Sequence, residues 1–190
     1  MRVPTRMSSQ DMDTPELEVL ITAMRRRHMR SVLRIEGEVY PRPWTIGLFL
    51  SELAIRQSRA YLVARVGGGV AGYGGLMILD GDGHISTLAV DPRWQRHKVA
   101  TRLLLTLTRV AIERGCGALT LEVRVSNTGA QALYSNFGFA PAGVRKGYYP
   151  ETNEDAIVMW AHDIDLPEYG ERLNAIEATI PGTTLVEGIS

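Results

Sequence analysis

The sequence has little or none of several features that would assign a class at once. It holds a single cysteine, Cys116, so no disulfide forms within the chain, and its histidines and cysteine lack metal-site spacing. No run of about 18 apolar residues is present, which argues against a membrane span. No apolar stretch follows the first arginines, so we expect no secretory signal. These absences predict a soluble, metal-free, cytoplasmic protein.

Net charge is absent too, because 21 Lys and Arg balance 21 Asp and Glu. A neutral chain argues against a general polyanion binder, and we expect no direct binding of nucleic acid. The balance is uneven along the chain. Residues 93–114 carry six bases and one acid, residues 163–190 carry six acids and one base, and a third cluster of arginines lies at 25–34. The simplest interpretation of the acidic end is a solvated tail.

What is present suits one α/β domain with a sizeable core, since 45% of the 190 residues are apolar. The helix expected at 99–114 connects two strands, which should therefore be parallel. We predict a mixed, twisted sheet of about seven strands with about four helices in a domain at 17–162. A mobile arm at 1–16 and an acidic tail of unknown role at 163–190 flank it. The expected strands are 17–23, 61–66, 70–79, 84–91, 118–125, 139–148 and 156–161, and the other expected helices are 27–38, 45–57 and 128–137.

A strand end, a turn and a basic helix start follow one another in LAVDPRWQRHKVATRLL at 88–104. The first N–H groups of a helix have no intrahelical acceptor, and the helix dipole places partial positive charge there. Lysine and arginine are mildly unfavourable at that end unless an anion binds. The arrangement therefore favours a phosphate site over a basic turn that only aids solubility.

With this loop, the sequence resembles the GCN5-related N-acetyltransferase (GNAT) superfamily, whose pyrophosphate loop reads Q/R-x-x-G-x-G/A. The stretch QRHKVA at 95–100 fits except at Lys98. LEVRVSNTGAQALYSNFGF at 121–139 and RKGYYP at 145–150, followed by EDAIVM, resemble the ribosomal-protein alanine N-acetyltransferase (RimI-type) branch. The similarity spans residues 17–162.

The resemblance implies a GNAT-like fold and acetyl transfer from acetyl-CoA to the N-terminal α-amine of a protein. The acceptor it implies is an alanine N-terminus of a ribosomal protein, which attacks directly in a ternary complex. Two alternatives stay open at this stage. One is a non-catalytic acyl-CoA-binding or ribosome-associated module, and the other is a GNAT enzyme that acts on a small-molecule or lysine amine. The oligomeric state is open as well.

By resemblance, Glu122 is the general base, acting through ordered water, and Tyr134 is the general acid for the leaving thiolate. From the residues alone, Glu122 also suits a solvated strand position and Tyr134 a helix aromatic packed on Phe137 and Phe139. The chemistry suits an α-amine acceptor. Such an amine, with a pKa near 7.7–8.0, is about one-fifth neutral at pH 7.3, whereas a lysine amine near 10.4 is only about 0.1% neutral.

The cofactor-binding residues that the resemblance implies belong to one strand end, the basic loop and the next helix start. Without the resemblance, the strand residues are merely buried, and Asn127 is a helix N-cap. Lys98 replaces the loop glycine. If the glycine is needed only for space, Lys98 is able to turn outward or contact the 3′-phosphate, and binding survives. If that position needs positive φ, Lys98 is strained by about 1–2 kcal/mol, which corresponds to roughly a tenfold loss in affinity. The set is Leu88, Ala89, Val90, Gln95, Arg96, His97, Lys98, Val99, Ala100, Thr101 and Asn127.

Aromatic residues in the loop between the first two expected helices and in the last expected hairpin are candidates for binding an acceptor peptide, although ordinary loop packing explains them equally well. They are Tyr40, Trp44, Tyr148 and Tyr149. Glu38, with its neighbour Glu36, has the charge to attract an α-ammonium group. We expect His84 and the other histidines to be surface or loop residues, and Cys116 to be a turn residue.

Overall fold

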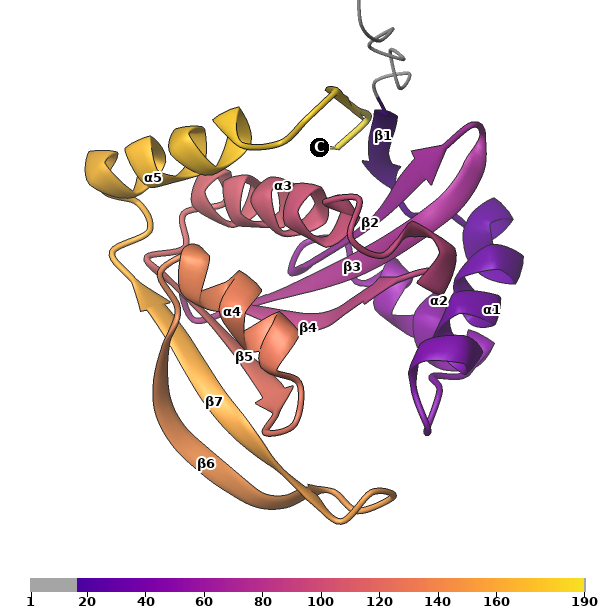
Figure 1. Cartoon of the computed structure of the whole chain (residues 1–190), viewed down its shortest axis with the longest axis horizontal. Helices are drawn as coiled ribbons and strands as arrows, with labels where there is room; N and C mark the ends of the chain where they lie inside the picture. The colour runs from indigo at the N-terminus through magenta and orange to yellow at the C-terminus, as the bar shows by residue number, and fades with distance from the viewer. Residues whose placement is uncertain (1–16, 190) are drawn as a thin grey trace, which may run out of the picture.

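The computed structural model describes residues 17–189, which form an eight-stranded sheet with helices on both faces (Figure 1). The expected α/β fold class is confirmed, with one strand and one helix more than predicted. The strand order is β6-β7-β5-β4-β3-β2-β1-β8. The strands are β1 (Glu18–Ala23), β2 (Arg59–Val66), β3 (Gly69–Leu79), β4 (Asp82–Val90), β5 (Ala118–Arg124), β6 (Ala140–Tyr149), β7 (Glu154–His162) and β8 (Thr183–Glu187). The α-helices are α1 (Met29–Val39), α2 (Ile46–Ala54), α3 (Val99–Glu113), α4 (Thr128–Asn136) and α5 (Pro167–Ala178).

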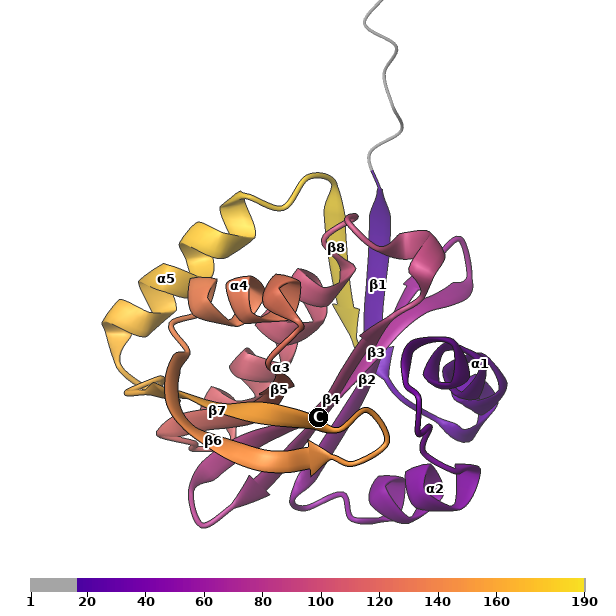
Figure 2. The same cartoon turned by 60° about the horizontal axis from the view of Figure 1, so that its bottom comes forward.

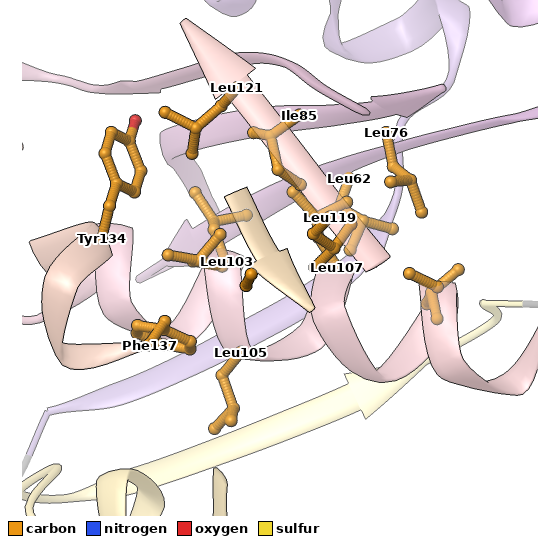
Figure 3. Close-up of a cluster of buried hydrophobic side chains, with 14 of the residues drawn as sticks. Leu62, Leu76, Ile85, Leu103, Leu105, Leu107, Leu119, Leu121, Tyr134 and Phe137 are labelled. Atoms are coloured by element: carbon orange, nitrogen blue, oxygen red, sulfur yellow. The ribbon is translucent and has the colours of Figure 1, made fainter. Parts of the chain in front are cut away.

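Two helices, α1 and α2, cover one face of the sheet, whereas α3, α4 and α5 lie on the other (Figure 2). Each face has its own core. On the α3 side, Leu103 and Leu107 pack against strand residues such as Leu119, as Figure 3 shows. On the other side, Val32 and Phe49 belong to a second cluster that includes strand residues. The side-chain oxygen of Thr45 accepts the backbone N–H of Leu48 at 3.2 Å, which confirms the expected N-cap of α2.

The sheet opens between β4 and β5. These strands run parallel, as the connecting helix predicted, but they pair only from Asp82–Ala118 to His84–Thr120. A register shift on the other side of β4 makes Ser86 the extra residue of a bulge, because Thr87 pairs with Gly75 and Ile85 with Leu76. Past His84 the two strands diverge, and the gap exposes the backbone edge of β4 toward β5.

A close approach at Gly72 fixes the start of α3 against the strands. A Cβ atom at this position would lie 2.8 Å from the carbonyl oxygen of Ala89 and 3.0 Å from Cγ1 of Val99. A larger residue would push the beginning of α3 away from β3 and β4. The glycine therefore helps to place the basic loop beside the end of β4.

The structure differs from the expected boundary at residue 162, because the chain continues into α5 and β8. Strand β8 pairs with β1 in parallel, from Glu18–Thr183 to Thr22–Glu187, and so belongs to the same sheet. Gly182 makes this possible, since its φ is +75° and an added Cβ would lie 2.3 Å from the carbonyl oxygen of Leu17. The acidic segment is thus a folded edge of the sheet.

Two arginines of α3 hold this C-terminal segment. Arg102 is 1% exposed and donates hydrogen bonds to the carbonyl oxygen of Pro181 and the hydroxyl of Thr184. The guanidinium of Arg109 contacts both carboxylate oxygens of Glu177, at 2.9 and 2.7 Å. Part of the basic charge of residues 93–114 is therefore matched by the C-terminal segment.

The expected arm at 1–16 lies outside the described residues. Across 17–189, no helix combines the length and the apolar character that a membrane crossing requires.

Candidate active site

A cleft of about 470 Å³ lies where β4 and β5 separate. It is bounded by the end of α1 and the loop after it, by both strands, by α4 and by the turn between β6 and β7. Eight of the predicted site residues line it: Tyr40, Trp44, Leu88, Glu122, Asn127, Tyr134, Tyr148 and Tyr149. Glu36, His84 and Arg124 line it as well.

A larger cavity, of about 740 Å³, lies near the C-terminal end of β1 and the start of β2. Arginines such as Arg56 line it, together with residues of α2, and none of the predicted site residues does so. Basic residues near the carboxyl ends of α2 and α3 complement the dipoles of those helices. Because predicted site residues line the cleft between β4 and β5 and none of them lines the larger cavity, that cleft is the candidate active site.

Glu122 on β5 is held by two partners at the apex of the opening. His84 Nε2 lies 2.6 Å from its Oε2, and Arg145 Nη1 lies 3.2 Å from its Oε1. An ionised carboxylate only accepts hydrogen bonds, so Nε2 carries the hydrogen. The hydrogen bond from His84 lowers the pKa of the Glu122 carboxyl, against the opposite effect of burial, and the charge of Arg145 lowers it further.

The expectation that His84 is a surface or loop residue is wrong, because it lies on β4 and bonds to Glu122. Its Nδ1 atom is buried and has no hydrogen-bond partner within the described chain. The contact follows from the parallel register, which pairs His84 with Thr120, two residues before Glu122. The contact between His84 and Glu122 could have been predicted only from the pairing register of β4 and β5, which local sequence patterns do not give.

Tyr134 reaches the cleft from α4 and is 8% exposed. Its ring packs on Phe139 with centroids 5.9 Å apart, and Figure 3 shows its hydroxyl pointing away from Phe137, toward Leu121. Burial raises the pKa of this phenol, and the neighbouring Tyr40 and Tyr149 raise it further. The hydroxyl therefore keeps its proton at neutral pH.

The aromatic residues of the loop after α1 and of the β6–β7 hairpin meet at the same cleft. The Tyr40 hydroxyl donates to the carbonyl oxygen of Leu88 at 3.0 Å, which joins the loop after α1 to β4. On the hairpin side, the rings of Tyr148 and Tyr149 are perpendicular with centroids 5.0 Å apart, and the Arg124 guanidinium lies 3.8 Å from the Tyr149 ring centroid. Two aromatic walls result.

The two acidic residues near the end of α1 have different surroundings. Glu38 is bonded to Arg34 at 2.9 Å, its side chain is 44% exposed, and it does not line the cleft. Glu36 is 2% exposed and lines the cleft, and its Oε1 accepts the Trp44 N–H at 2.9 Å. Its Oε2 has no partner among residues 17–189, and burial raises the pKa of this carboxyl to about 6.

The basic loop before α3 suits an anion. Residues 95–98 are all exposed, and Lys98 precedes the helix without a side-chain cap. The N–H groups of the first turn therefore receive no side-chain cap from Lys98. Both Arg96 and Lys98 adopt left-handed backbone conformations, with φ of +67° and +59°. Lys98 thus has a positive φ, which is the condition under which the sequence predicted strain at this position.

Buried Asp91 anchors this loop, a role that the sequence did not reveal. Its carboxylate accepts the backbone N–H of Arg93 at 3.0 Å and the Arg93 guanidinium at 2.6 and 2.9 Å, and it also pairs with Arg34. These bonds hold the pKa of the Asp91 carboxyl far below its usual range. On the other flank, Asn127 caps α4 by accepting the Ala130 N–H at 3.1 Å, as expected.

A sheet that opens between two parallel strands, with an anion-accepting helix start beside the opening, is the architecture of an α/β acyltransferase. Residues 29–139 match the model of the acetyltransferase (GNAT) family, and the chain belongs to this family. It is an N-acetyltransferase, and its acetyl donor is acetyl-CoA.

Individual relatives agree with this assignment. An Escherichia coli protein named [ribosomal protein bS18]-alanine N-acetyltransferase is 33% identical over 73% of this chain and 94% of its own length. A Bacillus subtilis protein provisionally given the same name is 37% identical over 72% of this chain and 91% of its own length. The crystal structure of the ribosomal-protein-S18-alanine N-acetyltransferase from Escherichia coli superposes with a TM-score of 0.70 at 31% identity, covering 76% of this chain and 94% of that one.

Proposed function

We propose that this enzyme acetylates the N-terminal α-amine of a protein, with an alanine N-terminus of ribosomal protein bS18 as the acceptor. The carrying observation is one cleft of about 470 Å³ that Glu122, Tyr134 and the aromatics of two separate loops line together. Such walls provide apolar contacts for the end of a polypeptide. The names of the relatives support the same acceptor. Since ribosomal proteins are made in the cytoplasm, the reaction would take place there.

Acetyl-CoA fits the residues beside the cleft. Its pyrophosphate suits the N–H groups at the start of α3, which have no side-chain cap, and the exposed side chains of the 95–98 loop. The backbone edge that β4 turns toward β5 at Leu88–Val90 offers donors and acceptors for the pantetheine amides, and Asn127 lies close to this path. Acetyl-CoA supplies an acetyl group activated as a thioester.

Glu122 and Tyr134 divide the proton transfers. Glu122 accepts, through an ordered water, the proton that the attacking amine loses. Tyr134 gives its hydroxyl proton to the departing thiolate, and the raised pKa of this phenol ensures that the proton is present. The backbone N–H of Val90 polarises the thioester carbonyl.

Direct attack by the amine is supported by the position of the chain's single cysteine. Cys116 is fully buried just after α3 and does not line the cleft. Within the described residues, the cleft therefore offers no thiol to carry the acetyl group, and both substrates would bind together.

The test is CoA release measured with a short peptide that begins in alanine. Two control acceptors are the same peptide with a blocked α-amine and an internal lysine, and a small primary amine. Turnover that requires the free α-amine is expected. Turnover of the small amine alone would reassign the enzyme to small-molecule acceptors, and turnover of the blocked peptide would reassign it to lysine.

A further inference from the structure

The carboxylates that line the cleft differ in their partners. Glu122 contacts His84 and Arg145, and Glu151 is bonded to Arg124 at 2.7 Å. Glu36 has no basic partner anywhere in the described part of the chain. Of the three, Glu36 alone faces the cleft with an uncompensated charge.

This charge is unfavourable for the fold. A buried carboxylate normally has a paired cation or a full set of hydrogen bonds, whereas Glu36 receives only the N–H of Trp44. Glutamine would accept that N–H equally well, because its side-chain oxygen takes the place of Oε1. The loop after α1 therefore needs an acceptor at this position but has no need of a negative charge. An unfavourable group of this kind in a cleft indicates a functional role.

The position of Glu36 is on the acceptor side of the cleft. It lies on α1 and binds Trp44, one of the aromatic residues of that wall. Tyr40 is the titratable group nearby, and the Glu36 charge raises the pKa of its phenol in addition to the larger effect of burial. Tyr40 in turn bonds to the backbone of Leu88 on β4. The charge is thus placed between α1 and the strand along which the donor is proposed to lie.

We propose that Glu36 supplies the negative charge that binds the α-ammonium group of the acceptor and so selects acceptors with a free, cationic N-terminus. This inference rests on the proposed function. Glu122, which is hydrogen-bonded to His84 and paired with Arg145, handles the proton, whereas Glu36 provides the attraction. Glu38, bonded to Arg34 outside the cleft, has no part in it.

A double-mutant cycle between protein and peptide tests the proposal. Dissociation constants are measured in the presence of CoA for an alanine-initiated peptide and for its analogue in which hydrogen replaces the amine. The wild-type protein is expected to prefer the amine by about tenfold, as a charge-assisted contact provides. Glu36→Gln should lose most of this preference and should melt no lower than the wild type, because the lost charge was unfavourable for the fold. Glu38→Gln is the matched control and should keep the full preference.

The pH dependence gives a second measurement that needs no variant. Burial raises the pKa of Glu36 to about 6, so its charge is lost below that pH, whereas the peptide ammonium and the Tyr40 phenol stay protonated. The preference for the amine should decline below pH 6 in the wild-type protein. This decline decides the question if Glu36→Gln fails to fold.

The outcomes separate the two proposals. If the wild-type protein binds no peptide, the proposed function fails and this inference fails with it. If the wild-type protein binds the peptide but Glu36→Gln shows the same preference for the amine, only the role of Glu36 is overturned. A wild-type preference that stays constant from pH 7.5 to 5 has the same consequence.

Discussion

Replacing Lys98 with glycine should stabilise this protein, because Lys98 has φ of +59°. A left-handed conformation costs a residue with a Cβ about 1–2 kcal/mol, and glycine avoids this cost. Glycine loses more chain entropy on folding, which offsets about 0.5–1 kcal/mol of the gain. A net stabilisation of about 0.5–1 kcal/mol follows, or a rise of roughly 1–4 °C in melting temperature for a chain of this length.

The comparison variant is Lys98→Ala, which removes the same charge but keeps the Cβ. Lys98→Gly should melt above Lys98→Ala in thermal unfolding followed by circular dichroism. Ala100→Gly, at the second residue of α3, is the control of opposite sign and should destabilise the protein by about 1 kcal/mol. If Lys98→Gly is no more stable than Lys98→Ala, the strain at this position is not real.

The same reasoning separates stability from acetyl-CoA binding. The positive φ of Lys98 belongs to the fold of the loop before α3, so we expect its cost to fall on folding rather than on binding. The sequence-based expectation of roughly a tenfold loss in affinity from strain therefore changes into an expected loss of stability. Titration with acetyl-CoA should give Lys98→Ala and Lys98→Gly similar affinities, since each lacks the same ammonium group.

Three further predictions concern catalysis and the C-terminal segment. Glu122→Gln should lower kcat by about 10²–10⁴ in steady-state assays while acetyl-CoA affinity, measured by calorimetry, stays near the wild-type value; an unchanged kcat would exclude Glu122 as the base. Tyr134→Phe should lower kcat by about 10² or more without unfolding the protein, because its ring packing on Phe139 is kept; full activity would contradict the acid role. Arg102→Ala should cost about 1–3 kcal/mol in denaturant unfolding and raise amide exchange in β8, because the acceptors at Pro181 and Thr184 lose the donor that the buried guanidinium of Arg102 provides. Exposed Arg96→Ala is its control and should change the stability little.

Much of the fold follows from local patterns. The apolar periodicity and the glycine turns predicted seven strands and four helices in the observed order, and only their ends differ by a few residues. Helix α5 carries a signal as well, because Tyr169, Leu173 and Ile176 recur at helical spacing, but the acidic composition masked it. Strand β8 is different. Five residues, TTLVE, form a strand because β1 offers a free edge, and no local pattern shows that edge.

Predicted residues that belong to motifs meet at the candidate site, whereas contacts that depend on strand register were missed. The bond between His84 and Glu122 joins residues 38 positions apart and needs the parallel pairing of β4 with β5. The choice between Glu36 and Glu38, in contrast, was accessible from the sequence. Val32 faces the core, and Glu36 follows it by four residues on the same helix face, whereas Glu38 does not. Charge alone could not distinguish these two carboxylates.

The six bases of residues 93–114 show why a charge count overstates an anion site. Arg93 is bound by Asp91, Arg102 is buried under the C-terminal segment, and Arg109 is paired with Glu177. Arg114 donates to the backbone oxygen of Arg59, far from the helix start. Arg96 and Lys98 are left, both exposed in the loop before α3 and without an ion pair inside residues 17–189. Affinity for the pyrophosphate should therefore depend on these two side chains and the N–H groups of the first helical turn, and the other four bases serve the fold.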